Sequence, residues 1–392
     1  RYTPGQQTPP IQTVFHFPEQ TILQHAEQCN GSGDCRKTQL SGGTMCPSYM
    51  ATRNEKDTTR ARANILREFL THSSKENRFD HKEIKEVLDL CLACKGCKSE
   101  CPSNVDMAKL KMEFLQHYYD ANGVPFRAKL ISNYNRLNGL AQFVPGIYNW
   151  MINTKATGNL IKKTSGFAKD RSLPGLQQTT LRRWYKKEWP AMKAILPAAT
   201  KKVYLFCDEF TNFNDTHIGI KAVQLLYRLG YDVMMIDHPE SARAWLSKGL
   251  LRKARVFAEQ NVRIFSEVIN DNVPLLGVEP SAILSFRDEY PDLVREDLRA
   301  SAKQLAKNVF LIDEFLNKEA EKGNITADQF TGEKKQIKLH GHCQQKALSS
   351  ALYSKNILSL PAQYSVEVIP SGCCGMAGSF GYEEEHYDLS MQ

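Results

Sequence analysis

The clearest chemistry in this sequence belongs to four cysteines in one short segment: Cys91, Cys94, Cys97 and Cys101. Their spacing, C-x2-C-x2-C-x3-C followed by proline, is the iron–sulfur ligand pattern of bacterial ferredoxins. In that pattern three thiolates hold one cluster and the fourth holds a second. We expect Gly96 to permit the turn of the ligand loop and Pro102 to redirect the chain. A zinc site and a set of structural cysteines are the alternatives.

A second cysteine motif lies nearer the start of the sequence and is incomplete. It contains Cys29, Cys35 and Cys46, with Pro47 after the last cysteine. Ser32 stands at the position that a middle cysteine would occupy. This motif therefore offers one thiol fewer than the first.

An exchange of the fourth cysteine between the motifs divides these residues into two ligand sets. The set predicted for one [4Fe-4S] cluster is Cys91, Cys94, Cys97 and Cys46. The set left for the second site is Cys29, Cys35 and Cys101. Three thiolates suffice for a [3Fe-4S] cluster, or for a [4Fe-4S] cluster whose fourth iron takes a non-cysteine ligand. Loss of the second site is the remaining alternative.

A third group joins Cys343 to the adjacent pair Cys373 and Cys374. Adjacent cysteines do not easily form a strain-free disulfide with each other, so two neighbouring thiols after a strand indicate a metal or redox site. Gly372 and Gly375 flank the pair and let the backbone approach a ligand closely. The alternative is a flexible glycine-rich turn with idle thiols. The sequence identifies no catalytic residue.

The composition excludes two broad classes of protein. Of the 392 residues, 42% are hydrophobic, which is typical of a globular chain. No segment approaches the ~18 apolar residues of a membrane-spanning helix.

The 11 cysteines, without a secretory signal, favour metal ligation in a reducing, cytoplasmic compartment. Because Arg1 is not a methionine, we expect a processed start or a piece of a longer chain.

The elements that position the first two groups are predicted to be helices. Residues 21–126 should form an α-helical, ferredoxin-like module after an extended lead-in of residues 1–20. One helix is expected to be capped by Asp57 or Thr58, and another to open at Asp80 with a capping box. The inward face of the first helix should carry Ala61, Ile65, Phe69 and Leu70.

The third group is predicted to lie in a duplicated α/β domain of the cysteine-rich Cys-Cys-Gly (CCG) type. Residues 203–336 form the first, degenerate unit, and residues 337–392 the second, truncated one. Strands alternating with helices favour a largely parallel sheet, and the expected strands are 203–206, 232–236, 275–278, 337–340 and 366–369. Each unit reads as strand, cysteine, helix, strand and loop. The first keeps only Cys207 and has His238-Pro239 in place of the cysteine pair.

Between these parts, residues 127–202 form a basic, aromatic-rich helical linker. The linker holds 15 Lys and Arg against 2 Asp and Glu, whereas the whole chain has a net charge of +8. Such surfaces dock on anionic membranes or protein partners. We therefore retain a peripheral contact with the inner face of the membrane as one alternative. A basic face that packs its aromatic side chains inward is the other, and no nucleic-acid partner is expected.

Several of these motifs resemble one family of proteins. The segment around Cys46, the runs Gly277–Ser281 and Phe286–Glu289, and the Cys-Cys-Gly loop are similar to the iron–sulfur part of FAD-linked oxidases. That family includes the glycolate oxidase iron–sulfur subunit and fused D-lactate and D-2-hydroxyglutarate dehydrogenases. The helical module resembles those of succinate and glycerol-3-phosphate dehydrogenases, and the α/β units resemble the cysteine-rich domains of heterodisulfide reductases.

The resemblance implies an iron–sulfur electron-transfer region. FAD would lie on a preceding N-terminal domain or on a flavoprotein subunit, which would oxidise a D-2-hydroxy acid. Electrons would pass through the clusters to a quinone or other acceptor, and this fragment alone would lack the substrate site. A thiol redox protein like heterodisulfide reductase and a docking module are the two alternatives. The family repeat would carry further cysteines at Ala282 and beyond Gln392.

Overall fold

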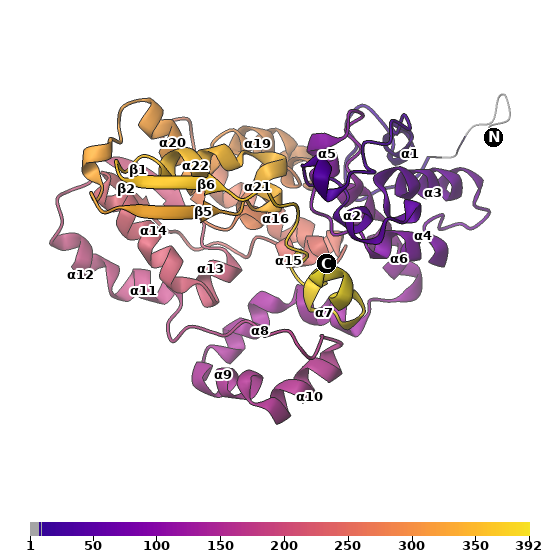
Figure 1. Ribbon diagram of the computed structural model, residues 1–392, viewed down its shortest axis with the longest axis horizontal. Coiled ribbons are helices and arrows are strands. Elements are labelled where there is room, and N and C mark those ends of the chain that lie inside the picture. Colours follow the sequence, from indigo (N-terminus) through magenta and orange to yellow (C-terminus); the bar gives the residue numbers. More distant parts are fainter. Residues whose placement is uncertain (1–7, 9) are drawn as a thin grey trace.

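The computed structural model describes residue 8 and residues 10–392, so the expected lead-in lies partly outside the described residues. Two main bodies lie next to each other, a helical module of residues 21–126 and an α/β part (Figure 1). A group of helices, residues 134–165, projects below them. None of the described helices is long and apolar enough to cross a bilayer.

The helical module contains no strand over residues 21–126, as the sequence predicts. Its helices are α1 (Ile22–Glu27), α2 (Pro47–Thr52), α3 (Thr59–His72), α4 (Lys82–Asp89), α5 (Gly96–Glu100) and α6 (Met107–Asn122). Thr58 caps α3 by accepting a hydrogen bond from the Ala61 amide, which confirms the predicted cap. The buried face of α3 is turned by one residue from the expected face, and it includes Arg62, Ala63, Leu66 and Leu70.

The capping box predicted at Asp80 is wrong. Helix α4 begins at Lys82, and its N-cap residue, His81, makes no side-chain capping bond. The Asp80 carboxylate instead accepts hydrogen bonds from Lys75 at 3.0 Å and from Asn122 of α6 at 2.7 Å. The Asp80 carboxylate therefore binds Lys75 and Asn122 and does not cap the helix that follows it.

The basic linker is helical, as expected. Its helices are α7 (Phe126–Ser132), α8 (Tyr134–Ala141), α9 (Pro145–Asn153), α10 (Lys155–Ser165), α11 (Leu181–Lys187) and α12 (Trp189–Ala194). Trp184 and Trp189 pack against the sheet of the α/β part. Helices α8 to α10 form the projecting group in Figure 1.

The α/β part is built on a parallel four-stranded sheet of order β2-β1-β3-β4. The strands are β1 (Lys201–Leu205), β2 (Tyr231–Met234), β3 (Leu275–Gly277) and β4 (Val309–Leu311). Val203 pairs with Val233, and Leu205 pairs with Leu276. Strand β4 was not predicted from the sequence, because its three residues lead directly into a helix without a turn signal.

Helices connect the strands of this sheet and follow the last of them. They are α13 (Glu209–Phe213), α14 (Thr216–Arg228), α15 (Arg243–Ser247), α16 (Leu251–Ser266), α17 (Pro280–Ile283), α18 (Tyr290–Leu293), α19 (Glu296–Ala306) and α20 (Ile312–Glu321). Between β2 and β3 the chain forms α15 and α16, which are separated at Gly249. A Cβ at Gly249 would lie 2.2 Å from Cβ of Leu115, so the break lets α6 approach closely.

A second, separate parallel pair follows, formed by β5 (Lys335–Leu339) and β6 (Tyr364–Val368). Helices α21 (Cys343–Leu348) and α22 (Ala351–Leu358) connect these strands, and α23 (Tyr387–Met391) comes last. Short 3-10 turns lie at Gln39–Ser41, Glu55–Asp57, Leu284–Phe286, Ala327–Gln329, Phe380–Tyr382 and Glu384–His386. The layout strand, two helices, parallel strand also describes β1 to β2. This shared layout supports the predicted repeat, and the duplication itself stays a prediction.

Polar contacts hold the helical module against the rest of the molecule. The Glu113 carboxylate of α6 accepts the amides of Val14 and Phe15, at 2.6 and 2.8 Å. His386, just before α23, lies 2.9 Å from the Asp89 carboxylate at the end of α4. The loop after α4, which carries the first cysteine motif, therefore lies near the boundary between the two bodies.

Candidate metal centre

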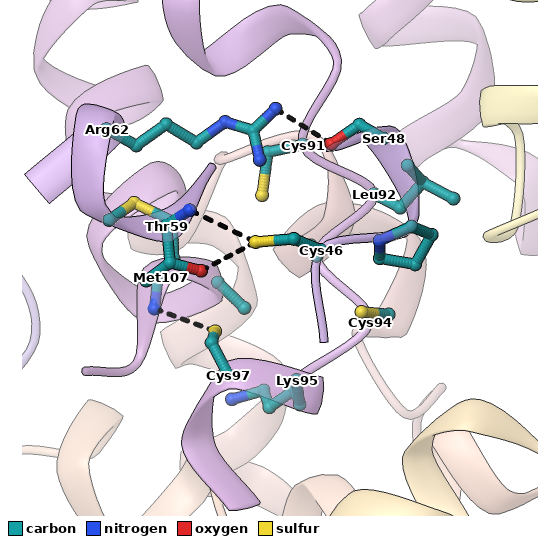
Figure 2. Close-up of a pocket in the computed structure, with 13 residues that line it drawn as sticks. Cys46, Ser48, Thr59, Arg62, Cys91, Leu92, Cys94, Lys95, Cys97 and Met107 are labelled. Atoms are coloured by element: carbon teal, nitrogen blue, oxygen red, sulfur yellow. Dashed lines mark hydrogen bonds between the residues drawn. The ribbon is translucent and has the colours of Figure 1, made fainter. Parts of the chain in front are cut away.

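Four thiols from the two N-terminal motifs line one cavity (Figure 2). They belong to Cys46, Cys91, Cys94 and Cys97. Cys46 directly precedes α2, Cys91 and Cys94 lie in the loop between α4 and α5, and Cys97 is in α5. The structure thus brings together the residues that the exchange rule assigned to one cluster. Their role as ligands stays a prediction.

Left-handed backbone shapes the walls of this cavity. The φ angle is 51° at Ala93, 62° at Lys95 and 55° at Cys46. For residues other than glycine this conformation costs roughly 1–2 kcal/mol each. A concentration of such residues is typical of functional sites, where surrounding structure offsets the cost. The two turns in the α4–α5 loop let Cys91, Cys94 and Cys97 reach one cavity.

Gly96 does not make the turn that the sequence analysis assigned to it, because its φ angle is not positive. Its lack of a side chain serves another purpose. A Cβ at this position would lie 3.1 Å from backbone atoms of Thr44 and Met45. That backbone leads directly into Cys46. Gly96 therefore lets the two cysteine motifs pack against each other.

Two helix N-termini direct amide groups at the thiols of the cavity. The amide of Thr59, the first residue of α3, donates to Cys46 Sγ at 3.0 Å. The amide of Met107, the first residue of α6, donates to Cys97 Sγ at 3.4 Å (Figure 2). Because the N-terminus of a helix is the positive end of its dipole, both contacts favour the thiolate form.

Burial works against free thiolates in this place. Burial, followed by the nearby Asp106 carboxylate, raises the pKa of Cys97 well above its usual range. Burial also raises the pKa of Cys94 to about 12, and the neighbouring thiolates of Cys373 and Cys91 add to the rise. Such thiols ionise together only beside a compensating cation, and iron supplies that charge. The donor set therefore fits an iron–sulfur cluster.

Arg62 lines the same cavity and was missed by the sequence analysis. Its side chain is 2% exposed. The guanidinium donates to Ser48 Oγ at 3.0 Å and to the Val87 carbonyl at 3.1 Å, which ties α3 to α2 and α4. The signal lay in the helical period, because Arg62 shares the buried face of α3 with Leu66.

The two prolines after the motifs have different surroundings. Pro47 lines the cavity and is the first residue of α2. Proline suits that position because the first amide of a helix has no intrahelical partner. Pro102 is exposed in the turn between α5 and α6. Only Pro47 therefore lies where it could border a cluster in the first cavity.

The three remaining N-terminal cysteines share the hydrophobic core of the helical module. Cys35 is buried in this core, and Cys29 and Cys101 are half-buried and pack against the core. The hydrogen bond with Cys46 lowers the pKa of Cys35 to about 6. Cys46 therefore adjoins both predicted ligand sets. Ser32, at the position of the missing thiol, is exposed.

The third group comes together as expected. Cys343 is the first residue of α21, and its Sγ lies 3.9 Å from Sγ of Cys373. Hydrogen bonds from Cys343 and Cys373 lower the pKa of Cys374, which is exposed. The amide of Gly375 donates to Cys373 Sγ at 3.4 Å. A Cβ at Gly375 would lie 2.3 Å from the carbonyl oxygen of Ser390, so glycine lets α23 support the loop.

This third group lies against the first cavity, which the sequence analysis did not anticipate. Helix α21 packs on α5. A Cβ at Gly372 would lie 3.8 Å from Met50 Sδ of α2, at ordinary van der Waals distance. Burial is the largest cause of the raised pKa of Cys94, and the thiolate of Cys373 also contributes to the rise. The three cysteine groups are therefore neighbours in one region of the molecule.

The cysteines of the two N-terminal motifs thus lie close together in one helical domain. Residues 28–106 match the family described as the 4Fe-4S dicluster domain. The matched segment contains all seven cysteines of the two N-terminal motifs. The match supports iron–sulfur ligation by this part of the chain.

Along most of its length the chain is similar to D-2-hydroxyglutarate dehydrogenases. It is 26% identical to that of Escherichia coli (strain K12) over 408 residues, and 25% identical to that of Haemophilus influenzae over 410 residues. These alignments cover 93% and 94% of this chain but 39% of each relative, so the chain spans well under half of their length.

A second kind of relative covers more of its own length. The chain is 24% identical over 292 residues to one subunit of the anaerobic glycerol-3-phosphate dehydrogenase of Escherichia coli (strain K12). That alignment covers 74% of this chain and 71% of the relative. No solved structure matches. The expected resemblance to iron–sulfur parts of such dehydrogenases is confirmed.

Proposed function

We propose that this chain is the iron–sulfur electron-transfer region of an FAD-linked D-2-hydroxy-acid dehydrogenase. The cavity in which Cys46 of one motif joins three cysteines of the other carries this proposal. The similarity to D-2-hydroxyglutarate dehydrogenases supports the substrate class. In this proposal the flavin and the substrate site belong to a part of the protein outside this sequence. A quinone or another acceptor takes the electrons.

The residues of this chain would hold and insulate the redox groups. A bound [4Fe-4S] cluster would supply one-electron transfer. The amides of Thr59 and Met107 stabilise the negative charge of the ligands, and Arg62 holds the helices that carry them. Cys343 and Cys373, next to Cys94, would form a further metal or redox site beside this cluster.

Iron and acid-labile sulfide analysis of protein purified without oxygen tests the proposal, together with electron paramagnetic resonance. We expect about seven or eight iron atoms, with a similar amount of sulfide, from two clusters in the helical module. The reduced protein should show a paramagnetic cluster signal. A colourless protein that carries zinc instead of iron would overturn the proposal.

Replacing Ser32 by cysteine should complete the second ligand set. If that site holds a three-iron cluster, we expect Ser32→Cys to add about one iron atom and to replace the three-iron signal of the oxidised protein by a four-iron signal after reduction. Ser41→Cys, a change at an exposed serine outside the ligand pattern, is the control. An unchanged spectrum in Ser32→Cys would contradict the assignment of this site.

We also propose that the projecting helices α8 to α10 dock on an anionic membrane surface. Large apolar side chains on this part face solvent, and they include Leu140, Phe143, Ile147, Trp150 and Leu160. Phe143 is 81% exposed and Trp150 is 61% exposed. Exposed apolar side chains beside an excess of Lys and Arg are typical of interfacial anchors. The aromatic residues of the linker therefore divide between the core and this surface.

Sedimentation with vesicles that contain phosphatidylserine tests the docking surface. We expect the double variant Ile147→Ser/Trp150→Ser to bind at least about tenfold more weakly, because each large apolar side chain contributes about 1.5–3 kcal/mol when buried. High salt should also weaken binding. Ile218→Ser/Leu225→Ser on α14, which removes exposed apolar side chains elsewhere, is the control. Equal binding by both double variants would refute the surface.

A further inference from the structure

A lysine inside the first cysteine motif makes a buried network of ion pairs with the α/β part. Lys95 lies between Cys94 and Gly96, and its side chain is 1% exposed. Its ammonium group hydrogen-bonds the Asp288 carboxylate and lies 3.2 Å from Glu289 Oε1. Both acids follow β3 in the α/β part. They belong to the run Phe286–Glu289, to which the sequence analysis gave no role.

The network extends on both sides of the boundary between the two bodies. On the side of the helical module, Lys98 pairs with Asp288, and Asp106 lies 3.4 Å from the Lys95 ammonium. On the other side, Arg243 of α15 donates to Glu289 Oε1 at 2.8 Å. Three cations thus face three carboxylates, and the formal charge of the set is zero.

Stability alone is a poor explanation for such a network. Taking charges out of water is costly, and well-packed apolar residues often replace buried ion pairs without loss of stability. The pairing here also leaves Glu289 Oε2 buried without a hydrogen-bond partner among the described residues. The position of Lys95 within the ligand loop indicates another use for its charge.

We propose that Lys95 is a positioning residue that anchors the Cys94–Cys97 loop to Asp288 and Glu289 and sets the reduction potential of the cluster held there. This inference rests on the proposed function, because it requires a cluster in the first cavity. The reduced cluster carries one more negative charge than the oxidised cluster, so a fixed cation nearby favours reduction and a nearby carboxylate opposes it. Lys95 and Asp288 therefore act in opposite directions.

Three variants separate these effects in the full chain. Lys95→Met should lower the ratio of reduced to oxidised first cluster at a fixed potential by about tenfold, which is a shift of 59 mV for one electron. Asp288→Asn should move the potential upward, and the double variant should return it toward the wild-type value. Lys109→Met is the matched control, because Lys109 pairs with Asp292 across the same boundary at 2.7 Å but lies outside the cysteine loop.

The measurement is a redox titration followed by electron paramagnetic resonance, with iron content measured on the same samples. The signal of the first cluster is the one that Cys97→Ser abolishes. Loss of that signal in Lys95→Met, with the signal kept in Lys109→Met, would also support the anchoring role. Wild-type potentials in both Lys95→Met and Asp288→Asn would overturn this inference alone. A wild-type protein without any cluster signal would overturn the proposed function and this inference together.

Discussion

The variant Cys97→Ser is expected to lose about four iron atoms and to keep the other cluster. The physical reason is that Cys97 is one of four thiols on the first cavity, where its Sγ also accepts the Met107 amide. Removal of one thiolate from a complete cysteine ligand set leaves an iron corner open to solvent and usually costs the cluster. The measurement is iron content per chain after anaerobic purification, with the spectrum of the reduced protein.

Pairs of variants reveal which cysteines share a cluster. Cys46→Ser/Cys97→Ser should lose no more iron than Cys97→Ser alone, because both thiols line the same cavity. Cys97→Ser/Cys101→Ser should lose the iron of both clusters. The iron losses of Cys46→Ser and Cys97→Ser should not add, because both thiols line one cavity and the effects of replacing neighbouring groups that act as a unit are not additive.

Cys207→Ser provides the control for these variants. Cys207 is buried two residues after β1, where its thiol lies 3.5 Å from Asn212 Oδ1, and it belongs to none of the three cysteine groups. Its replacement should leave the iron content unchanged. Because Cys46 also contacts Cys35, loss of the second cluster in Cys46→Ser, with the first retained, would refute the exchange of ligands.

Gly96→Val is expected to deplete the first cluster although it removes no ligand. Even a Cβ would lie 3.1 Å from the backbone of Thr44 and Met45, and the valine methyl groups need more space. Overpacking of this kind costs roughly 1–3 kcal/mol and would displace the segment that carries Cys46. We expect a lower thermal midpoint and loss of most iron from the first cluster. Gly96→Ala should show a milder form of both effects.

Gly146→Val tests whether a general loss of glycine could explain the result. A Cβ at Gly146 would meet nothing within 4 Å, and this residue lies in α9, away from the thiols. We expect wild-type iron content and a nearly unchanged thermal midpoint. Full iron occupancy in Gly96→Val would show that the two motifs do not depend on this close approach.

Local features of the site could be predicted from the sequence because they depend on neighbouring residues. The cysteine spacing fixes which thiols one loop can present, and Thr58 lies directly before the helix that it caps. Other local patterns failed where a distant group competed. The Asp80 carboxylate hydrogen-bonds Lys75 and Asn122 and does not cap α4. The left-handed turn that was predicted at Gly96 is formed by Ala93 and Lys95.

The sequence by itself determined the chemistry of the protein: cysteines in ligand spacing, a helical module, and strands alternating with helices. Those properties follow from covalent spacing and from hydrophobic period. Only the tertiary structure decided that Cys373 lies beside Cys94, that Lys95 pairs with Asp288, and that Phe143 faces solvent. Each of these depends on which surfaces of distant segments cover one another. Which surfaces meet is decided by packing over the whole chain, so these contacts could not be predicted from any short stretch of residues.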